Sequence, residues 1–164
     1  MAIIDLHNKN PMADGRQSEN ALLVRRGVQQ LLRHMRHAAI AEMTLRNGRR
    51  ADLISISDKG EIWIIEIKSS LEDFRVDHKW PDYRAYCDRL FFATHAAVPL
   101  EVFPDDCGLV LADRFGAEIL REAPEHRLPA ARRKALTLEF SRLAAERLTL
   151  AEWALEKFEK EQGG

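Results

Sequence analysis

The sequence predicts an α/β fold in which a mixed central sheet is flanked by helices, and three observations support this. Apolar residues recur at helical spacing near both ends of the chain, over 18–38 and from Pro129 onward. Between them lie short stretches rich in Ile, Val and Phe that are separated by turn residues. The resulting order is helix, three strands, helix, two strands, helix. The length of 164 residues, with 46% hydrophobic residues, suits one core.

The first part of the chain divides into an arm and a helix. Residues 1–16 contain Asn, Pro, Asp and Gly without periodicity, and we expect a flexible arm there. A helix is predicted over residues 18–38, and Ser18 is suited to cap its first turn. We expect a single domain over residues 17–164.

The middle of the chain is predicted to supply the sheet. The first three strands are separated by Gly-ending turns, which favours a β-meander. The five expected strands are 39–45, 50–57, 61–68, 89–94 and 108–112. A short edge strand is possible over 116–120. A helical region broken at Trp80-Pro81 precedes the fourth strand, because proline fits a first helical turn. From Pro129 to about Lys160 the pattern is helical, as one helix or two.

Composition and charge exclude several classes of protein. No apolar run approaches the ~20 residues of a membrane span. The N-terminus lacks the features of a signal peptide, so we expect a cytoplasmic protein with Cys87 and Cys107 reduced. The net charge of −1 argues against strong non-specific binding of nucleic acid. This net charge is still compatible with a DNA enzyme whose positive charge is local, because contacts to phosphates depend on a patch of basic residues and not on the total charge.

A candidate site is predicted where two adjacent strands carry acidic residues. Glu66 and Lys68 are two apart on the third strand, so their side chains share a face. If the preceding turn is the three-residue loop 58–60 with its glycine in the left-handed region, Asp52 lies directly opposite Glu66. A two-residue loop would instead place Asp52 opposite Ile67 and take its side chain out of the site.

Opposed carboxylates indicate a divalent metal ion. Like charges destabilise a cross-strand pair, with Cβ atoms only about 4.5–5.5 Å apart. Mg²⁺ would compensate this repulsion, since it binds carboxylate and phosphate oxygens and retains several waters. Such an ion activates water, and a lysine beside it orients or deprotonates that water. We therefore expect Asp52, Glu66 and Lys68 to form a phosphodiester-cleaving site.

Sequence motifs strengthen this expectation. Residues 47–94, NGRRADLISISDKGEIWIIEIKSSLEDFRVDHKWPDYRAYCDRLFFAT, resemble the PD-(D/E)XK nuclease superfamily. Asp52 matches its acidic motif, and Glu66-Ile67-Lys68 matches (D/E)XK. More narrowly, the chain is similar to the MmcB-like family of bacterial DNA-repair proteins, which residues 108–138 also fit. The resemblance covers roughly residues 18–148.

The resemblance implies both a fold and a function. The fold is a restriction-endonuclease-like αβββαβ core, and the activity is Mg²⁺- or Mn²⁺-dependent DNA endonuclease cleavage in bacterial repair or damage-induced (SOS) mutagenesis. The implied metal ligands are Asp52, Glu66 and Ile67, with Lys68 catalytic. The implied partners are DNA and DNA-repair or translesion-synthesis proteins. The alternative is a nuclease-fold module that no longer cuts, and that binds DNA or recruits a partner. The sequence does not define the oligomeric state.

A further acid is expected, with two candidates. If the loop 46–48 also has three residues, Glu42 lies opposite Asp52. A two-residue Asn-Gly turn would put Glu42 on the other face. Glu19 on the first helix is the rival, because superfamily members often take this acid from the first helix or strand.

DNA contacts are predicted close to the acidic pair in sequence. The candidates are Arg49, Arg50, Lys79, Tyr83 and Arg84. For Tyr83, packing of its helix onto the sheet is the favoured role, and stacking on an unpaired base is the alternative that would make it a DNA contact. A second basic cluster contains Arg127, Arg132, Arg133 and Lys134, and it is either a DNA contact or a solvated helix face.

Overall fold

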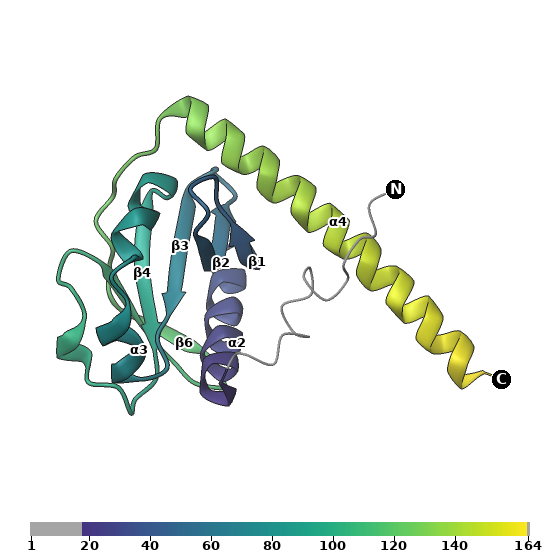
Figure 1. The fold of residues 1–164 in the computed structure, drawn as a ribbon, viewed down its shortest axis with the longest axis horizontal. Helices are drawn as coiled ribbons and strands as arrows, with labels where there is room; N and C mark the ends of the chain where they lie inside the picture. The colour runs from purple at the N-terminus through teal and green to yellow at the C-terminus, as the bar shows by residue number, and fades with distance from the viewer. Residues whose placement is uncertain (1–17, 164) are drawn as a thin grey trace.

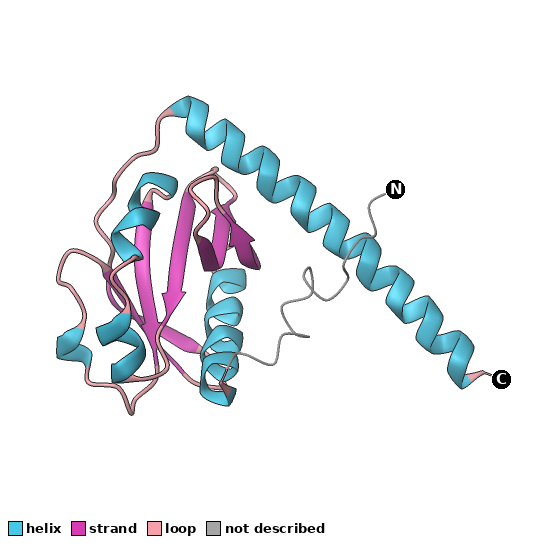
Figure 2. Ribbon diagram, viewed as in Figure 1, coloured by secondary structure: helices cyan, strands magenta, loops and turns pink. Residues whose placement is uncertain are grey.

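Six strands form one sheet between two helical layers in residues 18–163, the part of the chain that the computed structural model describes (Figures 1 and 2). The expected arm over residues 1–16 lies outside this part. The helical elements are α2 (Glu19–His34), α3 (Leu71–Val76), the 3₁₀ helices η1 (Trp80–Tyr86) and η2 (Leu100–Val102), and α4 (Ala130–Gln162). The strands are β1 (His37–Thr44), β2 (Arg50–Ser57), β3 (Ile62–Ile67), β4 (Arg89–Thr94), β5 (Gly108–Ala112) and β6 (Ala117–Arg121).

The sheet is mixed, as predicted. Its strand order follows the chain from β1 to β6, with β1, β2 and β3 antiparallel to one another. β3, β4 and β5 run parallel, and β6 returns antiparallel to β5 as the edge strand. α3 and η1 lie in the crossover between β3 and β4, because parallel neighbours need a long connection. The observed order matches the αβββαβ core up to β4, with β5, β6 and α4 following it.

The two faces of the sheet are covered by different elements. α2 covers one face through Val24, Val28 and Leu32, which pack on Leu53, Ile65 and Phe91 among others. The other face is covered by α3, η1 and the first half of α4, whose buried side chains include Tyr83, Leu136 and Phe140. The central strands are therefore buried on both sides. This explains why β3 is buried at every position and does not alternate.

Both hairpin turns have three-residue loops. Ser57 and Glu61 close the second loop through an N–H to carbonyl hydrogen bond of 2.9 Å, and Gly60 has φ +84°. Leu45 and Arg49 close the first loop at 2.7 Å. Gly60 occupies the left-handed region, where a side chain is costly. The expectation that placed Asp52 opposite Glu66 is therefore confirmed.

The first helix is shorter than predicted. α2 begins at Glu19, with the Ser18 hydroxyl accepting from the Ala21 N–H at 3.1 Å, so the predicted cap is confirmed. The helix ends at His34 instead of residue 38 because Arg36 adopts φ +60°, which a helix does not allow. His37 and Ala38, which the prediction had placed in the helix, already belong to β1. There the His37 ring is buried and contacts the Ser55 hydroxyl at 2.9 Å.

The C-terminal region forms one long helix. The sequence pattern had not decided between one helix and two there. α4 spans 33 residues, and residues 151–163 are exposed. Figure 1 shows this end of α4 extending away from the sheet. Its exposed apolar side chains include Leu148, Trp153, Leu155 and Phe158. No helix within residues 18–163 combines the length and apolar character needed to cross a membrane.

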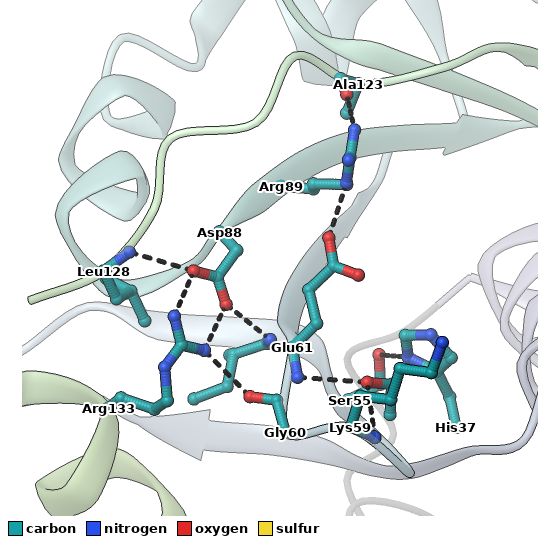
Figure 3. Close-up of polar contacts among 12 residues, drawn as sticks. His37, Ser55, Lys59, Gly60, Glu61, Asp88, Arg89, Ala123, Leu128 and Arg133 are labelled. Atoms are coloured by element: carbon teal, nitrogen blue, oxygen red, sulfur yellow. Dashed lines mark hydrogen bonds and ion pairs between the residues drawn. The ribbon is translucent and has the colours of Figure 1, made fainter. Parts of the chain in front are cut away.

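The start of α4 is fastened to the sheet by a buried ion pair. The Asp88 carboxylate, at the beginning of β4, accepts from both terminal nitrogens of Arg133 at 2.6 Å (Figure 3). It also accepts the main-chain N–H groups of Ile62 and Leu128, at 2.7 and 2.9 Å. Burial raises the pKa of Asp88, but these hydrogen bonds outweigh it and the net pKa is lowered. Arg133 thus has a structural role.

Candidate functional site

The site lies where β2 and β3 separate at the end opposite their hairpin turn. Regular pairing between the two strands ends at Leu53 and Ile65. Beyond that point two side chains replace the ladder. The Asp52 carboxylate accepts the Ile67 N–H at 2.8 Å, and the Glu66 carboxylate accepts the Asp52 N–H at 3.1 Å. Each strand is therefore held to the other by one carboxylate.

Burial makes this acidic pair unfavourable without a compensating charge. Glu66 is 3% exposed. Burial and the neighbouring Asp52 charge raise the pKa of Glu66 well above its usual range, against the hydrogen bond from the Asp52 N–H and the charge of Lys68. Burial also raises the pKa of Asp52, and the Ile67 hydrogen bond offsets this only in part. Two ionised carboxylates are thus costly here, which favours a shared proton or a bound cation.

Lys68 completes the group, and a residue that the sequence analysis did not identify holds it. The Lys68 Nζ lies 2.6 Å from the Asp77 carboxylate, and both side chains are about nine-tenths buried, at 11% and 12% exposure. The other Asp77 oxygen accepts the Lys79 N–H at 2.8 Å. Burial raises the pKa of Asp77, but the bonds from Lys68 and Lys79 outweigh it and lower the net value. Asp77 lies between α3 and η1, where no periodic pattern or motif marks it.

A cleft of about 440 Å³ opens beside the acidic pair. Asp52 and Ile67 line one side, and Ser69, Ser70 and Asp73 line another. Ser18, Asn20 and Ala21 from the first turn of α2 complete it. Within residues 18–163, no group of three or more acidic, histidine or cysteine side chains is arranged to hold a metal ion. A metal at this point would thus depend on two carboxylates and on oxygens that are not side-chain acids.

Glu42 lies near Asp52, as the three-residue first loop predicts. Its neighbours in β1 pair with Ala51 and Leu53, and its charge contributes to the raised pKa of Asp52. Glu42 itself has φ +53°, an uncommon conformation for a residue with a side chain. Its charge also acts on Arg25 of α2 and on Arg147 of α4. Glu42 is therefore placed among basic groups as well as beside the acidic pair.

Glu19, the rival candidate, begins α2 and is exposed. The part of α2 that lines the cleft consists of its immediate neighbours Ser18, Asn20 and Ala21. Of the two candidate acids, Glu42 is the one whose charge acts on the Asp52 carboxylate.

The predicted DNA contacts differ in their surroundings. Arg50 and Lys79 are exposed, and Arg49 is half-buried with its guanidinium 2.9 Å from the Asp82 carboxylate. Tyr83 as a base-stacking residue is wrong for this structure, because its ring is buried and its hydroxyl donates to the Arg50 carbonyl at 2.9 Å. Tyr83 instead packs η1 onto the sheet, which is the role that its sequence context favours.

The remaining basic residues are mostly engaged within the chain. Arg84 lies 2.8 Å from the Asp106 carboxylate and over the Trp80 ring. In the later cluster, Arg132 donates to the Ala85 carbonyl at 2.8 Å, and Arg133 pairs with Asp88. Their positive charge therefore fastens loops and α4 in place.

These features define an α/β protein with an acidic pair and a lysine gathered at a fork in the sheet. The family model described as "DNA repair protein MmcB-like" matches residues 8–155, and the chain belongs to this MmcB-like family. A solved structure, the SPO1766 protein of unknown function from Silicibacter pomeroyi, is 41% identical with a TM-score of 0.79. That match covers 83% of this chain and 93% of the other. No curated protein matches the chain.

Proposed function

We propose that this protein is a Mg²⁺-dependent DNA endonuclease of the PD-(D/E)XK type that acts in bacterial DNA repair. The observation that carries the proposal is the reciprocal hydrogen bonding of Asp52 and Glu66 across the β2–β3 fork. It fixes a buried and a half-buried carboxylate, both of raised pKa, beside a cleft, where a divalent cation would neutralise both. Membership of a DNA-repair family supports DNA as the substrate.

The donor set suits a hard cation. Mg²⁺ binds one or two carboxylates and completes its coordination with water and substrate phosphate oxygens. Asp52 and Glu66 would supply the carboxylates, and Ile67 can contribute only its main-chain carbonyl. The remaining ligands would then be water and substrate phosphate oxygens. When bound, the ion would activate a water and stabilise negative charge on the phosphate.

The residues of the chain itself would position the reacting groups. The Ile67 N–H fixes one oxygen of Asp52, and the Asp52 N–H fixes one oxygen of Glu66. The Lys68 ammonium is held beside the pair by the Asp77 carboxylate, 2.6 Å from its Nζ. From there it would orient the attacking water and offset the charge that develops on the phosphate. Arg50 and Lys79, both exposed, are the groups best suited to contact the DNA backbone.

A separate observation favours the alternative function, a nuclease-fold module without cleavage activity. Because the Lys68 ammonium is already 2.6 Å from the Asp77 carboxylate, its capacity for hydrogen bonding is partly used. A nuclease-fold module that binds DNA or recruits a repair partner, without cleavage, would tolerate this arrangement. Retained DNA binding without affinity for Mg²⁺ or Mn²⁺ would favour that module.

The test is cleavage of single-stranded, duplex, flap and forked DNAs with Mg²⁺ or Mn²⁺. Wild type should cut at least one of these substrates, and Lys68→Ala should lose activity by roughly 10²- to 10⁴-fold, the usual contribution of a proton-transfer group. Lys59→Ala is the matched control, because Lys59 is exposed in the hairpin turn at the far end of β2 and β3. Equal cleavage by wild type and Lys68→Ala would contradict the proposal.

A further inference from the structure

An exposed phenylalanine is presented at the turn between β5 and β6. Phe115 is 76% exposed, and the Arg114 guanidinium lies 4.7 Å from its ring centre. The turn is well defined, because the Asp113 carboxylate accepts the N–H groups of Phe115 and Gly116 at 2.7 and 3.1 Å. A further hydrogen bond of 2.9 Å joins the Asp113 N–H to the Gly116 carbonyl. The turn therefore presents an aromatic ring to solvent with a guanidinium beside it.

The turn is also seated closely on α2. A Cβ atom added at Gly27 would lie 2.4 Å from the Asp113 carbonyl oxygen and 2.5 Å from that of Gly116. Only glycine permits this approach, so the helix backbone contacts the turn directly. Phe115 thus projects from a rigid support, which lowers the entropic cost of binding.

A cleft of about 770 Å³ lies beside this phenylalanine. Leu23, Val24 and Leu111 give it apolar walls, while Asn20 and Glu118 add groups able to form hydrogen bonds. Apolar walls with a few polar groups suit a planar ring that carries hydrogen-bonding edges. A nucleobase has this chemistry, and Arg114 adds a positive charge suited to its phosphate.

This cleft adjoins the cleft at the acidic pair. Asn20 lines both of them. His95 lines the Phe115 cleft, and its Nε2 lies 2.7 Å from the carbonyl oxygen of Ser69, which lines the Asp52 cleft. A DNA strand lying along α2 would therefore pass from one cleft into the other.

We propose that the Phe115 cleft binds an unpaired nucleobase of the strand whose phosphate lies at the Asp52–Glu66 site, an assignment that rests on the proposed function. A base within a duplex has its faces covered by its neighbours and cannot enter such a cleft without leaving the stack. The substrate class is therefore DNA with unpaired bases next to the scissile phosphate: single strands, flaps or gaps.

Binding of DNA in the presence of EDTA tests this assignment separately from cleavage. The probes are a short fluorescein-labelled single strand, the same strand in a duplex, and the strand carrying 2-aminopurine. Phe115→Ala should raise the Kd for the single strand by roughly 5- to 100-fold, as loss of one stacked base does. Phe115→Trp should bind the single strand about as tightly as wild type, because it keeps an aromatic ring for stacking. Wild type should bind the duplex more weakly than the single strand. Phe158→Ala is the matched control, because Phe158 is 60% exposed at the far end of α4.

Each outcome decides the assignment. Quenching of 2-aminopurine by wild type but not by Phe115→Ala would support it. Equal single-strand affinity of wild type and Phe115→Ala, or no single-strand binding by wild type, would overturn it. Metal-dependent cleavage that is insensitive to Phe115→Ala would leave the nuclease standing and remove the base site. Binding that depends on Phe115, without cleavage in the presence of any metal ion, would support the base site and contradict the nuclease activity.

Discussion

Asp52 and Glu66 each accept a main-chain N–H from the opposing strand, at 2.8 and 3.1 Å. Side chains thus take over the pairing of β2 and β3 at the point where the ladder ends. This arrangement keeps the carboxylates in place although their charges repel. Its cost in the metal-free protein is seen in the raised pKa of both acids.

The stability of the metal-free protein should therefore depend on the ionisation of Glu66. Because burial raises the pKa of Glu66, the folded chain binds this proton more tightly than the unfolded chain does. The stabilisation is complete below the ordinary carboxylate pKa and is lost as pH rises through the raised value. Glu66→Gln should flatten this part of the pH profile and raise the unfolding free energy at neutral pH by on the order of 1 kcal/mol.

Urea denaturation in EDTA at several pH values measures this effect. Glu156→Gln is the control, because Glu156 is exposed on the end of α4 that extends away from the sheet. A pH profile that is the same in wild type and Glu66→Gln would show that the acidic pair carries no such cost.

Asp88 should give the opposite dependence on pH. Its pKa is lowered on folding because the hydrogen bonds from Arg133, Ile62 and Leu128 outweigh burial. The stabilisation is present above the unfolded pKa of Asp and is lost as pH falls through the lowered folded value. Asp88→Ala should cost about 3–5 kcal/mol at neutral pH, since it leaves Arg133 without its buried partner. The measurement is urea unfolding at neutral and acid pH, followed by circular dichroism. Wild-type stability of Asp88→Ala at neutral pH would contradict this prediction.

Asp77 should affect turnover more than DNA affinity. It touches the Lys68 ammonium at 2.6 Å, and its side chain is nearly nine-tenths buried, so it is not itself placed to contact the DNA backbone. Asp77→Asn should lower kcat roughly 10-fold or more, because the ammonium loses the carboxylate that orients it. The Kd for DNA should stay within a factor of about two. Asp58→Asn, in the exposed hairpin turn, serves as the control. An unchanged kcat would remove Asp77 from the positioning of Lys68.

The two halves of α4 should differ in their contribution to stability. Leu136 is 2% exposed and packs in the core, so Leu136→Ala should cost about 2–5 kcal/mol. Leu155 is 62% exposed, so Leu155→Ala should change the unfolding free energy by less than about 0.5 kcal/mol. Chemical denaturation of the two variants compares them directly. A loss at Leu155 as large as that at Leu136 would mean that this end of α4 is buried in solution.

The pairing of the strands was predictable because it follows local rules. Gly60 fixes the loop length, and the loop length fixes which residues of β2 and β3 face each other. The Ile-rich sequence of β3 suits the burial on both faces that the structure shows. Asp52, Glu66 and Lys68 could be grouped on this basis before any coordinates were known.

Other features could not be predicted because they depend on contacts distant in sequence. The end of α2 depends on Arg36, whose left-handed conformation has no sequence signature. The sequence favours a packing role for Tyr83 but leaves contact with substrate open, and only the position of η1 against the sheet shows that its ring is buried. The role of Asp77 depends on the crossover after β3, which brings it back to Lys68.

The most direct test of the central claim is calorimetric titration of the wild-type protein and Glu66→Gln with Mn²⁺ at neutral pH. We expect wild type to bind Mn²⁺ at a site that Glu66→Gln lacks, and bound metal should raise the melting temperature of wild type alone. Saturation at 100 times the Kd would add about 2.7 kcal/mol of stability. No Mn²⁺ binding by wild type, or equal binding by both proteins, would contradict the claim that Asp52 and Glu66 hold a metal ion.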